Sequence, residues 1–416
     1  MYIIGQEEID ALARVVNSKA LFRYGIGHEC ERFETRYAAW LGAKYFSLAA
    51  SGSYALNAAM IGLGIGPGDE VLVPAHTYMA SATSVLAAGA IPVITEIDES
   101  LTIDPAAIEA AIGPRTRAII AVHMWGTTCD MDAIMEIARR RKLIVVEDAC
   151  QAVGGSYKGR KLGTIADIGA YSFNFYKNMS AGEGGGVATN DEAVLKRVNC
   201  AIDPCHAFWT GRGEEEMPFA GNGARVSELT GAVLNVQLDR IDEIIAAMRR
   251  ERDAIHAGIE PSLKLGLRLA PLNSRDFDCG TNVFLTAPSG QVAELFVQTF
   301  PSIIAGNTGR HTYTEWDQVL MGSGAAHPLM NPYKMEANAK CRKMYTRDMC
   351  ARSLDILSRT ILVPTHPLHT KQDIDDIIHN INAAARVALG QATRDGIDIR
   401  NAAPVDATKY DIRASA

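Results

Sequence analysis

The chain alternates between short, nearly continuous apolar runs and segments whose apolar residues recur at helical spacing. Two such runs, at 117–123 and 142–148, bracket a segment at 131–141 that we expect to be a helix. Strands that are apolar throughout are typical of a parallel sheet covered by helices on both faces. The order strand, helix, strand therefore predicts an α/β domain built on a mostly parallel sheet.

Helical periodicity also marks the N-terminal part of the chain. Residues 6–18 place Ile9, Leu12 and Val16 on one stripe, which predicts an amphipathic opening helix. A second helix is expected to begin just after Ser51, because apolar residues follow that serine with a period near 3.6. Both patterns are typical of helices that bury one face.

The C-terminal half reads as a smaller α+β unit. A long helical pattern from Glu228 to about 257 links the two halves, and a strand is expected at 282–286 with a helix near 290–300. A terminal helix begins at the capping pair Thr370 and Asp373 and carries isoleucines on one face. We therefore divide the chain into a large domain at 1–245, a small domain at 246–390 and a polar tail at 391–416.

The composition excludes several classes of function. The 416 residues are 48% hydrophobic and 21% charged, with a net charge of −7, so no basic surface for nucleic acid or for a membrane is expected. The N-terminus lacks a basic segment followed by an apolar one, so no signal peptide is expected, and no run of eighteen apolar residues occurs. Its eight cysteines include no CxxC pair, and Cys200 and Cys205 lack partners for a metal site. We expect a cytoplasmic protein with reduced thiols and no metal.

Candidate chemistry concentrates in the segment from Tyr171 to Gly186. A strand-like run carries Ser172, then Lys177, then a turn made almost entirely of glycine, which allows a close backbone approach to a ligand. The aromatic and small residues around Lys177 do not favour a solvated, charged ammonium group. A lysine with a lowered pKa in such a place can act as a nucleophile and form a Schiff base.

An acidic residue upstream supports a chemical role for Lys177. Asp148 ends the apolar run at 142–148, at the expected carboxyl edge of a buried parallel strand. Pyridoxal phosphate needs a lysine for its aldehyde and an acid that keeps its pyridine nitrogen protonated. Lys177 and Asp148 together supply both, so we predict this cofactor.

At these residues the chain resembles the DegT/DnrJ/EryC1/StrS family of sugar aminotransferases that depend on pyridoxal phosphate. The Glu-Asp-Ala-x-Gln-Ala-x-Gly run at 147–154 and the Ser-Phe-x-x-x-Lys-x-x-x-x-Gly-Glu-Gly-Gly run at 172–185 carry the resemblance, which covers about residues 3–388. It implies a fold-type-I pyridoxal phosphate transferase, with a large domain holding the cofactor and a small C-terminal domain.

The resemblance also implies roles for residues that would be ambiguous alone. It assigns the cofactor phosphate to Gly52, Ser53 and Ser172, and the phenolic oxygen to Gln151. It places the ring of Tyr78 on the pyridine face. From the residues themselves, Ser51–Ser53 could simply cap a helix, and Tyr78 could simply fill core. The roles of Arg23, His76, His311 and His327 stay open.

A homodimer with shared active sites is a further implication of the resemblance. The segment at 221–228 is similar to a family loop that enters the neighbouring subunit's site. The resemblance makes Asn222 the candidate ligand of the partner's cofactor phosphate. Asn222 stands three residues before Arg225, whereas the family pattern places the asparagine two residues before the arginine. The alternative is a loop that caps its own helix.

The predicted function is transfer of an amino group from glutamate or glutamine to a keto-sugar or keto-cyclitol. Such a reaction belongs to the biosynthesis of secondary metabolites or surface sugars. Dehydratases in the family replace the lysine by histidine, and Lys177 argues against that activity. Another fold-type-I enzyme, such as an aldolase or desulfurase, or a non-catalytic regulator that binds pyridoxal phosphate, remains the alternative.

Overall fold

A seven-stranded sheet forms the centre of the larger part of the molecule. The computed structural model describes residues 3–210 and 219–400. The strand order is β1-β9-β8-β5-β4-β2-β3, and the five strands from β8 to β3 are parallel, whereas β9 runs antiparallel to both of its neighbours. Along the sheet the strands are β1 (Tyr45–Ala49), β9 (Gly185–Thr189), β8 (Ile168–Ser172), β5 (Ile144–Asp148), β4 (Thr116–Val122), β2 (Glu70–Pro74) and β3 (Ile91–Thr95).

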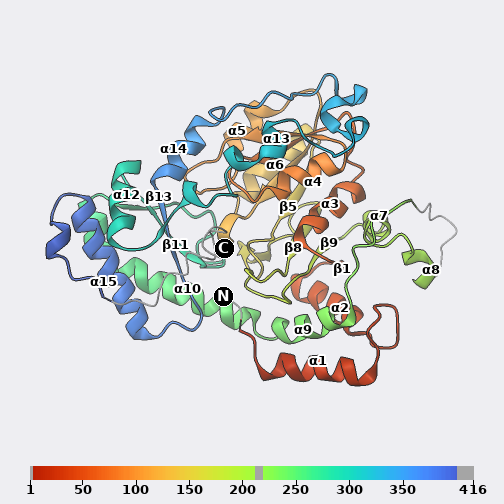
Figure 1. Ribbon diagram of the computed structural model, residues 1–416, viewed down its shortest axis with the longest axis horizontal. Helices are drawn as coiled ribbons and strands as arrows, with labels where there is room; N and C mark the ends of the chain where they lie inside the picture. The colour runs from red at the N-terminus through yellow and green to blue at the C-terminus, as the bar shows by residue number, and fades with distance from the viewer. Residues whose placement is uncertain (1–2, 211–218, 401–416) are drawn as a thin grey trace.

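Helices cover both faces of this sheet (Figure 1). Val71 and Val73 of β2 pack into one apolar cluster with α3, α4 and α7, while Leu72 between them packs into a second cluster with α2, α6 and α10 (Ile241–Gly258). Successive residues of a strand point to opposite faces, which explains the continuous apolar runs. The helices of this part are α2 (Glu29–Leu41), α3 (Gly52–Gly62), α4 (Ala80–Ala87), α5 (Pro105–Ala111), α6 (Met131–Arg141), α7 (Glu192–Ile202) and α8 (His206–Thr210).

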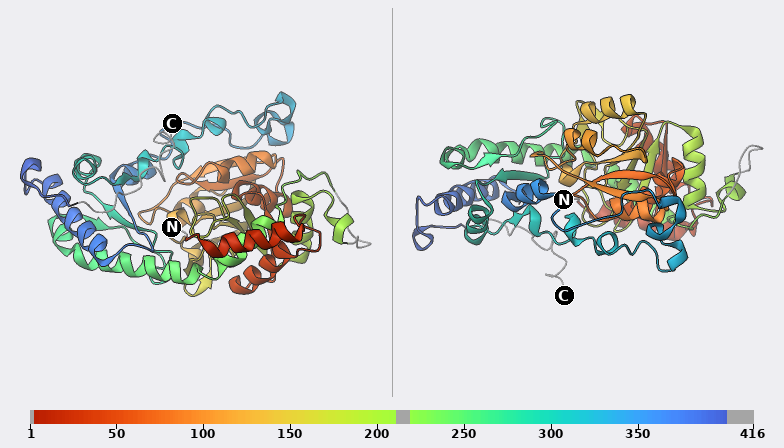
Figure 2. Two further views of the ribbon diagram at one scale, coloured as in Figure 1. Left: turned by 60° about the horizontal axis from the view of Figure 1, so that its bottom comes forward. Right: turned by 90° about the horizontal axis from the view of Figure 1, so that it is seen from above.

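The opening helix α1 (Gln6–Ser18) forms where it was predicted, but it buries a different face. Ala11 and Val15 pack on α9, beside which α1 lies in Figure 2, whereas Ile9 and Val16 are 58% and 56% exposed. The buried Glu8 on the inner face accepts a hydrogen bond from Arg240 at 2.5 Å. The helix is amphipathic as predicted, with Ala11, Val15 and the Glu8–Arg240 ion pair on its inward face and the side chains of Ile9 and Val16 exposed in this chain.

The smaller unit is a four-stranded antiparallel sheet with helices packed on it. Its strand order is β10-β11-β13-β12, and a third apolar cluster joins it to α10, α12 and α15. Its elements are β10 (Arg268–Leu269), β11 (Asn282–Thr286), β12 (Ile303–Ile304), β13 (Thr360–Pro364), α11 (Glu260–Leu265), α12 (Gly290–Thr299), α14 (Ala351–Arg359) and α15 (Lys371–Ala388). The predicted strand at 282–286 and the Thr370–Asp373 capping box at the start of α15 are both present.

The connection between the two parts is not one helix, as the pattern from Glu228 to 257 predicted, but two. Helix α9 (Glu228–Leu238) ends before Asp239, and α10 (Ile241–Gly258) begins after Arg240. The break places the Arg240 guanidinium on Glu8. Helical periodicity continues through this junction, so the pattern alone did not reveal the break.

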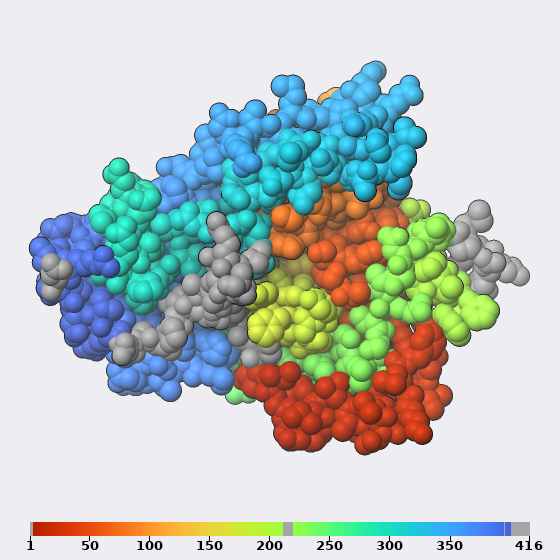
Figure 3. All heavy atoms as spheres, in the orientation of Figure 1, coloured from red at the N-terminus to blue at the C-terminus, as the bar shows by residue number. Residues whose placement is uncertain are grey.

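One segment that we placed in the small domain packs on the large one. Residues 313–350, which we call the strap, contain η3 (Tyr313–Glu315) and α13 (Asp317–Leu320), and lie against the orange N-terminal part of the chain in Figure 3. The Tyr345 hydroxyl donates to the Pro92 carbonyl of β3 at 2.7 Å, and Arg342 Nε donates to Glu70 of β2 at 2.9 Å. The boundaries at 245 and 390 stay a prediction. The strap follows residue 245 in the chain, yet it packs on strands β2 and β3 of the large sheet.

The described end of the chain lies along the last helix. Asn380 Nδ2 of α15 donates to the Arg400 carbonyl at 2.9 Å. Residues 391–400 of the predicted tail are thus attached to α15, and 401–416 lie outside the described residues. Within the described ranges, the helices all lack the combination of length and apolar character needed to cross a membrane.

Candidate active site

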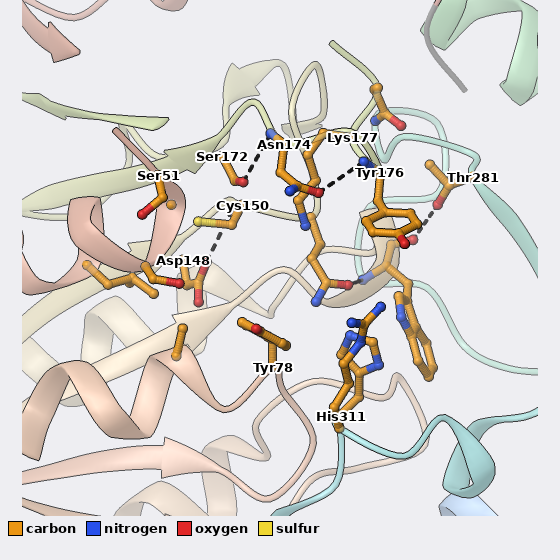
Figure 4. A pocket seen from close by; sticks show the side chains of 18 of the residues that line it. Ser51, Tyr78, Asp148, Cys150, Ser172, Asn174, Tyr176, Lys177, Thr281 and His311 are labelled. Carbon is orange, nitrogen blue, oxygen red and sulfur yellow. Dashed lines mark hydrogen bonds between the residues drawn. The ribbon is translucent and has the colours of Figure 1, made fainter. Parts of the chain in front are cut away.

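A cavity of about 300 Å³ opens at the carboxyl ends of β5 and β8, between the two parts of the molecule. Residues from the large sheet form one wall, and Thr281, Asn282, Arg310 and His311 from the later part of the chain form another (Figure 4). Ligands of open parallel sheets bind at this edge. Of the eight residues predicted for the site, the cavity brings together seven: Gly52, Ser53, Tyr78, Asp148, Gln151, Ser172 and Lys177.

Asp148 closes β5 and reaches the cavity floor as a nearly buried carboxylate, 4% exposed. Its Oδ2 accepts a hydrogen bond from Ser81 Oγ at 2.7 Å, and its Oδ1 accepts one from the Cys150 amide at 3.1 Å. Thr77 lies 2.7 Å from the Ser81 hydroxyl and donates to it. Sequence reasoning missed Ser81, because a serine in the first turn of a helix gives no sign of a partner 67 residues away.

Lys177 enters the cavity from the turn that follows β8. Asn174 shapes this turn, since its carbonyl accepts from the Lys177 amide at 3.0 Å and its Oδ1 accepts from the Tyr176 amide at 3.1 Å. Burial lowers the pKa of the Lys177 amine, Cys150 and Asp148 oppose that shift, and the Arg310 cation adds to it. A lowered pKa raises the fraction of neutral amine, which is the nucleophilic form of a lysine.

The beginning of α3 forms the far end of the cavity. Ser51 is the N-cap and accepts from the Tyr54 amide at 3.1 Å, so the first N–H groups of this helix face the cavity with Ser172 beside them. A Cβ at Gly52 would lie 2.6 Å from the Ser172 Cβ, and one at Gly185 would lie 2.4 Å from the Ser51 carbonyl carbon. Glycine is required at both positions for this close approach. Free N–H groups at a helix start favour an anion.

Tyr78 and Gln151 line the middle of the cavity. The Tyr78 ring is 38% exposed and lies between Asp148 and His311 in Figure 4, so it is a wall of the cavity rather than core filling. Gln151 accepts a hydrogen bond from the Trp125 amide at 3.3 Å. That bond orients the Gln151 side chain along the cavity wall.

Aromatic and imidazole rings that sequence reasoning left unassigned form the opposite side. Trp125 has a left-handed backbone (φ 47°) and contacts the His76 and His311 rings edge-on, at centroid distances of 4.5 and 5.6 Å. Burial lowers the pKa of His76 to about 4. Burial also lowers the pKa of His311 well below its usual value, with smaller contributions from His76 and Arg310. Both imidazoles are therefore neutral at neutral pH.

Asn222 does not line the cavity of its own chain. Its amide donates to the Ala201 carbonyl at 3.1 Å, and the Ala224 amide donates to the Ile202 carbonyl at 2.7 Å. Arg225 forms an ion pair with Asp203 at 3.2 Å. The loop at 221–225 is thus braced against α7, and whether it reaches a partner's site stays a prediction.

The architecture defines the class of protein first. A mostly parallel seven-stranded sheet, a cavity at its carboxyl edge and a smaller antiparallel unit match the solved aminotransferase from Psychrobacter cryohalolentis, with a TM-score of 0.77, 26% identity, and coverage of 92% of this chain and 97% of that one. The predicted fold class, a fold-type-I pyridoxal phosphate transferase, is confirmed.

The family follows from the sequence comparison. The model of the DegT/DnrJ/EryC1/StrS aminotransferase family matches residues 2–264, so the chain belongs to that family and the predicted resemblance is confirmed. Over 230 residues it is 40% identical to GDP-perosamine synthase of Caulobacter vibrioides, covering 54% of this chain and 60% of that protein. Over 263 residues it is 36% identical to L-glutamine:2-deoxy-scyllo-inosose aminotransferase of Streptoalloteichus tenebrarius, covering 60% of this chain and 61% of that protein. The chain thus spans about 60% of the length of each of these two relatives.

Proposed function

We propose that this protein is a pyridoxal phosphate-dependent aminotransferase that moves an amino group from glutamate or glutamine to a keto-sugar or keto-cyclitol. One observation carries the proposal: Lys177, Asp148 and the start of α3 all open into a single cavity. An amine for the aldehyde, an acid for the pyridine nitrogen and N–H groups for the phosphate are what this cofactor requires of a protein.

The residues present fit the cofactor. The first N–H groups of α3, with Ser53 and Ser172, would hold the phosphate, and the glycines at 52 and 185 keep side-chain atoms out of that end. Among the described residues, two neutral donors hydrogen-bond to Asp148, which leaves acceptor capacity for a protonated ring nitrogen. Tyr78 offers a flat apolar face, and Gln151 offers an amide for the phenolic oxygen.

The chain's own residues then carry the proton transfers. When bound, pyridoxal phosphate supplies an electron sink for the carbanion at the donor's Cα. Lys177 Nζ would hold the cofactor through its aldehyde and, once displaced by the donor, would serve as the base that takes a proton from the donor's Cα. Asp148, held by Ser81 and the Cys150 amide, would face the ring nitrogen and stabilise positive charge there.

The relatives support the substrate classes. One is a synthase of a nucleotide-linked amino sugar, and the other takes L-glutamine and a keto-cyclitol, by their names. The amino sugar in the first name and the L-glutamine and keto-cyclitol in the second support the donor and acceptor classes proposed for this chain. Biosynthesis of secondary metabolites or surface sugars is the setting that this proposal implies. A cytoplasmic location is part of the same prediction.

A homodimer with shared sites is also part of the proposal. The loop at 221–223 precedes a well-packed helix and would project toward the partner's phosphate end. Mixing Lys177→Ala subunits with subunits altered in that loop should restore activity, because one site of each hybrid would carry no lesion. Verified hybrids that stay inactive would confine each site to one chain.

The experiment that tests the function is a half-reaction screen. The purified enzyme is first converted to its pyridoxamine form with glutamate or glutamine, and individual keto-sugars and keto-cyclitols are then added. Return of the pyridoxal absorbance with one acceptor, and an aminated product by mass spectrometry, is the expected result. Conversion by neither donor would favour the non-catalytic regulator. Loss of a carbon fragment or of sulfur from another amino acid would favour an aldolase or desulfurase.

A further inference from the structure

Trp125 lines the cavity with a backbone conformation that is rare for a bulky residue. Its φ of 47° and ψ of 35° lie in the left-handed region, and the residue is only 4% exposed. Gly126 follows with a φ of 83°, so two consecutive residues are left-handed. A left-handed backbone at a large side chain is strained, and it persists only where the surrounding contacts impose it.

A segment of the smaller unit imposes this conformation. The Thr281 hydroxyl donates to the Trp125 carbonyl, a bond drawn as a dashed line at Thr281 in Figure 4. The Cys279 amide donates to the Gly126 carbonyl at 2.9 Å. A Cβ at Gly126 would lie 2.5 Å from Thr281 Oγ1, so a side chain there would collide with the clamp. Thr281 directly precedes β11 and Trp125 follows β4, and the clamp therefore joins the two parts of the molecule.

The clamped backbone decides how Gln151 presents its amide group. The Trp125 N–H donates to Gln151 Oε1 at 3.3 Å. Because a backbone N–H can only donate, the oxygen end of the Gln151 amide faces Trp125, and the Nε2 end, which carries two donors, is left for the cavity that Gln151 lines. Gln151 is therefore a hydrogen-bond donor toward a ligand.

We propose that Thr281 and Trp125 are positioning residues that make Gln151 a donor to the phenolic oxygen of the cofactor. This inference rests on the proposed function, in which Gln151 faces that oxygen, and it adds the residues that fix the orientation of its amide. The smaller unit thereby acts on the cofactor through a chain of hydrogen bonds from Thr281 to Trp125 and from Trp125 to Gln151. Thr281 lines the cavity itself, but the Trp125 carbonyl takes its hydroxyl proton.

The test follows the absorbance of the bound cofactor against pH in the holoenzyme. A donor to the phenolic oxygen weakens the hold of that oxygen on the proton of the nitrogen that joins the cofactor to Lys177. Thr281→Val removes the hydroxyl and nearly keeps the shape of the side chain. It should raise the midpoint of the absorbance change by about half a pH unit or more, because that proton is then held more strongly. Thr281→Ser keeps the hydroxyl and should titrate as the wild type does.

A double-mutant cycle shows whether Thr281 acts through Gln151. Gln151→Leu should raise the midpoint at least as much as Thr281→Val does. The double variant should then match Gln151→Leu, since the clamp has nothing left to orient. Additive shifts would mean that Thr281 acts on the cofactor by itself, and they would overturn the proposal.

Thr360→Val is the matched control. Thr360 is a buried threonine of β13 outside the cavity, and its hydroxyl donates to the Ile356 carbonyl at 2.7 Å. Its loss should leave the midpoint unchanged, and a shift equal to that of Thr281→Val would reduce Thr281 to a general support of the fold. Melting temperature and cofactor content show whether each variant folds, and Thr281→Ala carries the test if Thr281→Val does not fold.

Hydrogen exchange gives a readout that does not depend on the cofactor. In the apoenzyme, the Trp125 amide should exchange about tenfold faster in Thr281→Val than in the wild type, because the strained backbone is no longer held. Unchanged exchange in the folded variant would contradict the clamp, and an unchanged midpoint would contradict its effect on the cofactor. A wild type that binds no pyridoxal phosphate would overturn the proposed function, whereas the exchange result would still decide whether the clamp exists.

Discussion

Glu147 and Asp148 are adjacent acidic residues on β5, and their side chains lie on opposite faces of the sheet. They point to opposite faces, and both are nearly or fully buried, at 0% and 4% exposure. The number and kind of their partners differ. That difference shows how one strand end can supply a structural acid and a chemical acid side by side.

Glu147 is saturated with partners. His123 Nε2 donates to it at 3.1 Å, and the Cys129 amide donates to His123 Nδ1, which fixes that tautomer. The remaining donors to Glu147 are the amides of Gly163 at 2.7 Å, Ile165 at 2.6 Å and Ala166 at 2.7 Å. With four donors the carboxylate holds the loop before β8 in place and has no capacity left for a ligand.

Asp148 is only partly satisfied. Two donors, Ser81 and the Cys150 amide, fix its plane, and its remaining acceptor sites face the cavity. We therefore assign the chemical role to Asp148, whose hydrogen-bond acceptor sites are not all used by the protein.

The change Asp148→Asn should separate activity from folding. The amide keeps the shape of the side chain and removes the charge that protonates the ring nitrogen. We expect a loss in rate of at least about a hundredfold, on the order of 3 kcal/mol of transition-state stabilisation, with little change in melting temperature. Half-reaction kinetics with the cofactor bound provide the measurement. Near-normal turnover would refute the role of Asp148.

Glu147→Gln should lower the stability of the fold and leave the reaction rate nearly unchanged. An amide presents N–H groups to backbone N–H donors, so at least one buried donor loses its acceptor. We expect the free energy of unfolding to fall by about 2 kcal/mol in urea titrations, with the rate per folded molecule nearly unchanged. If the folded variant were as slow as Asp148→Asn, the two acids would not be divided in this way.

Ser81→Ala should lower the reaction rate, as Asp148→Asn does, but by a smaller factor. It removes one neutral donor to a carboxylate that keeps the Cys150 amide. A rate decrease of about fivefold, or roughly 1 kcal/mol, is expected. The matched control is Ser84→Ala on the same helix, whose hydroxyl donates to a backbone carbonyl of α4. Equal effects of both substitutions would point to a general disturbance of α4.

The amine of Lys177 should titrate below its usual pKa of 10.5, since burial favours the neutral form. In the apoenzyme, its modification by an amine-reactive reagent should accelerate as pH rises through a midpoint below that value. Peptide mapping over a pH series measures this midpoint. A midpoint at or above 10.5 would contradict the desolvated environment of Lys177.

Much of this arrangement could be predicted from the sequence because the decisive residues lie in short segments. Asp148 and Lys177 each end a strand-like run, and strands of a parallel sheet align their carboxyl ends without further information. The helix at 131–141 and the strand at 282–286 form at the predicted residues, since their apolar patterns are continuous.

The rest depends on contacts that a local pattern does not contain. Ser81 and Arg310 reach the site from segments far from Lys177 in the chain, and neither has a local signal. The inward face of α1 and the junction between α9 and α10 meet in the ion pair of Glu8 with Arg240, two residues that lie 232 positions apart in the chain. Periodicity gives the existence of an apolar face, whereas a distant partner decides which face is buried.

The central claim is that Lys177 holds the cofactor in the cavity that Asp148 closes. Its most direct test is borohydride reduction of the holoenzyme followed by peptide mass mapping. We predict one pyridoxyl label per chain, on Lys177, and no label in Lys177→Ala. Recovery of the label on any other lysine would contradict the site as a whole.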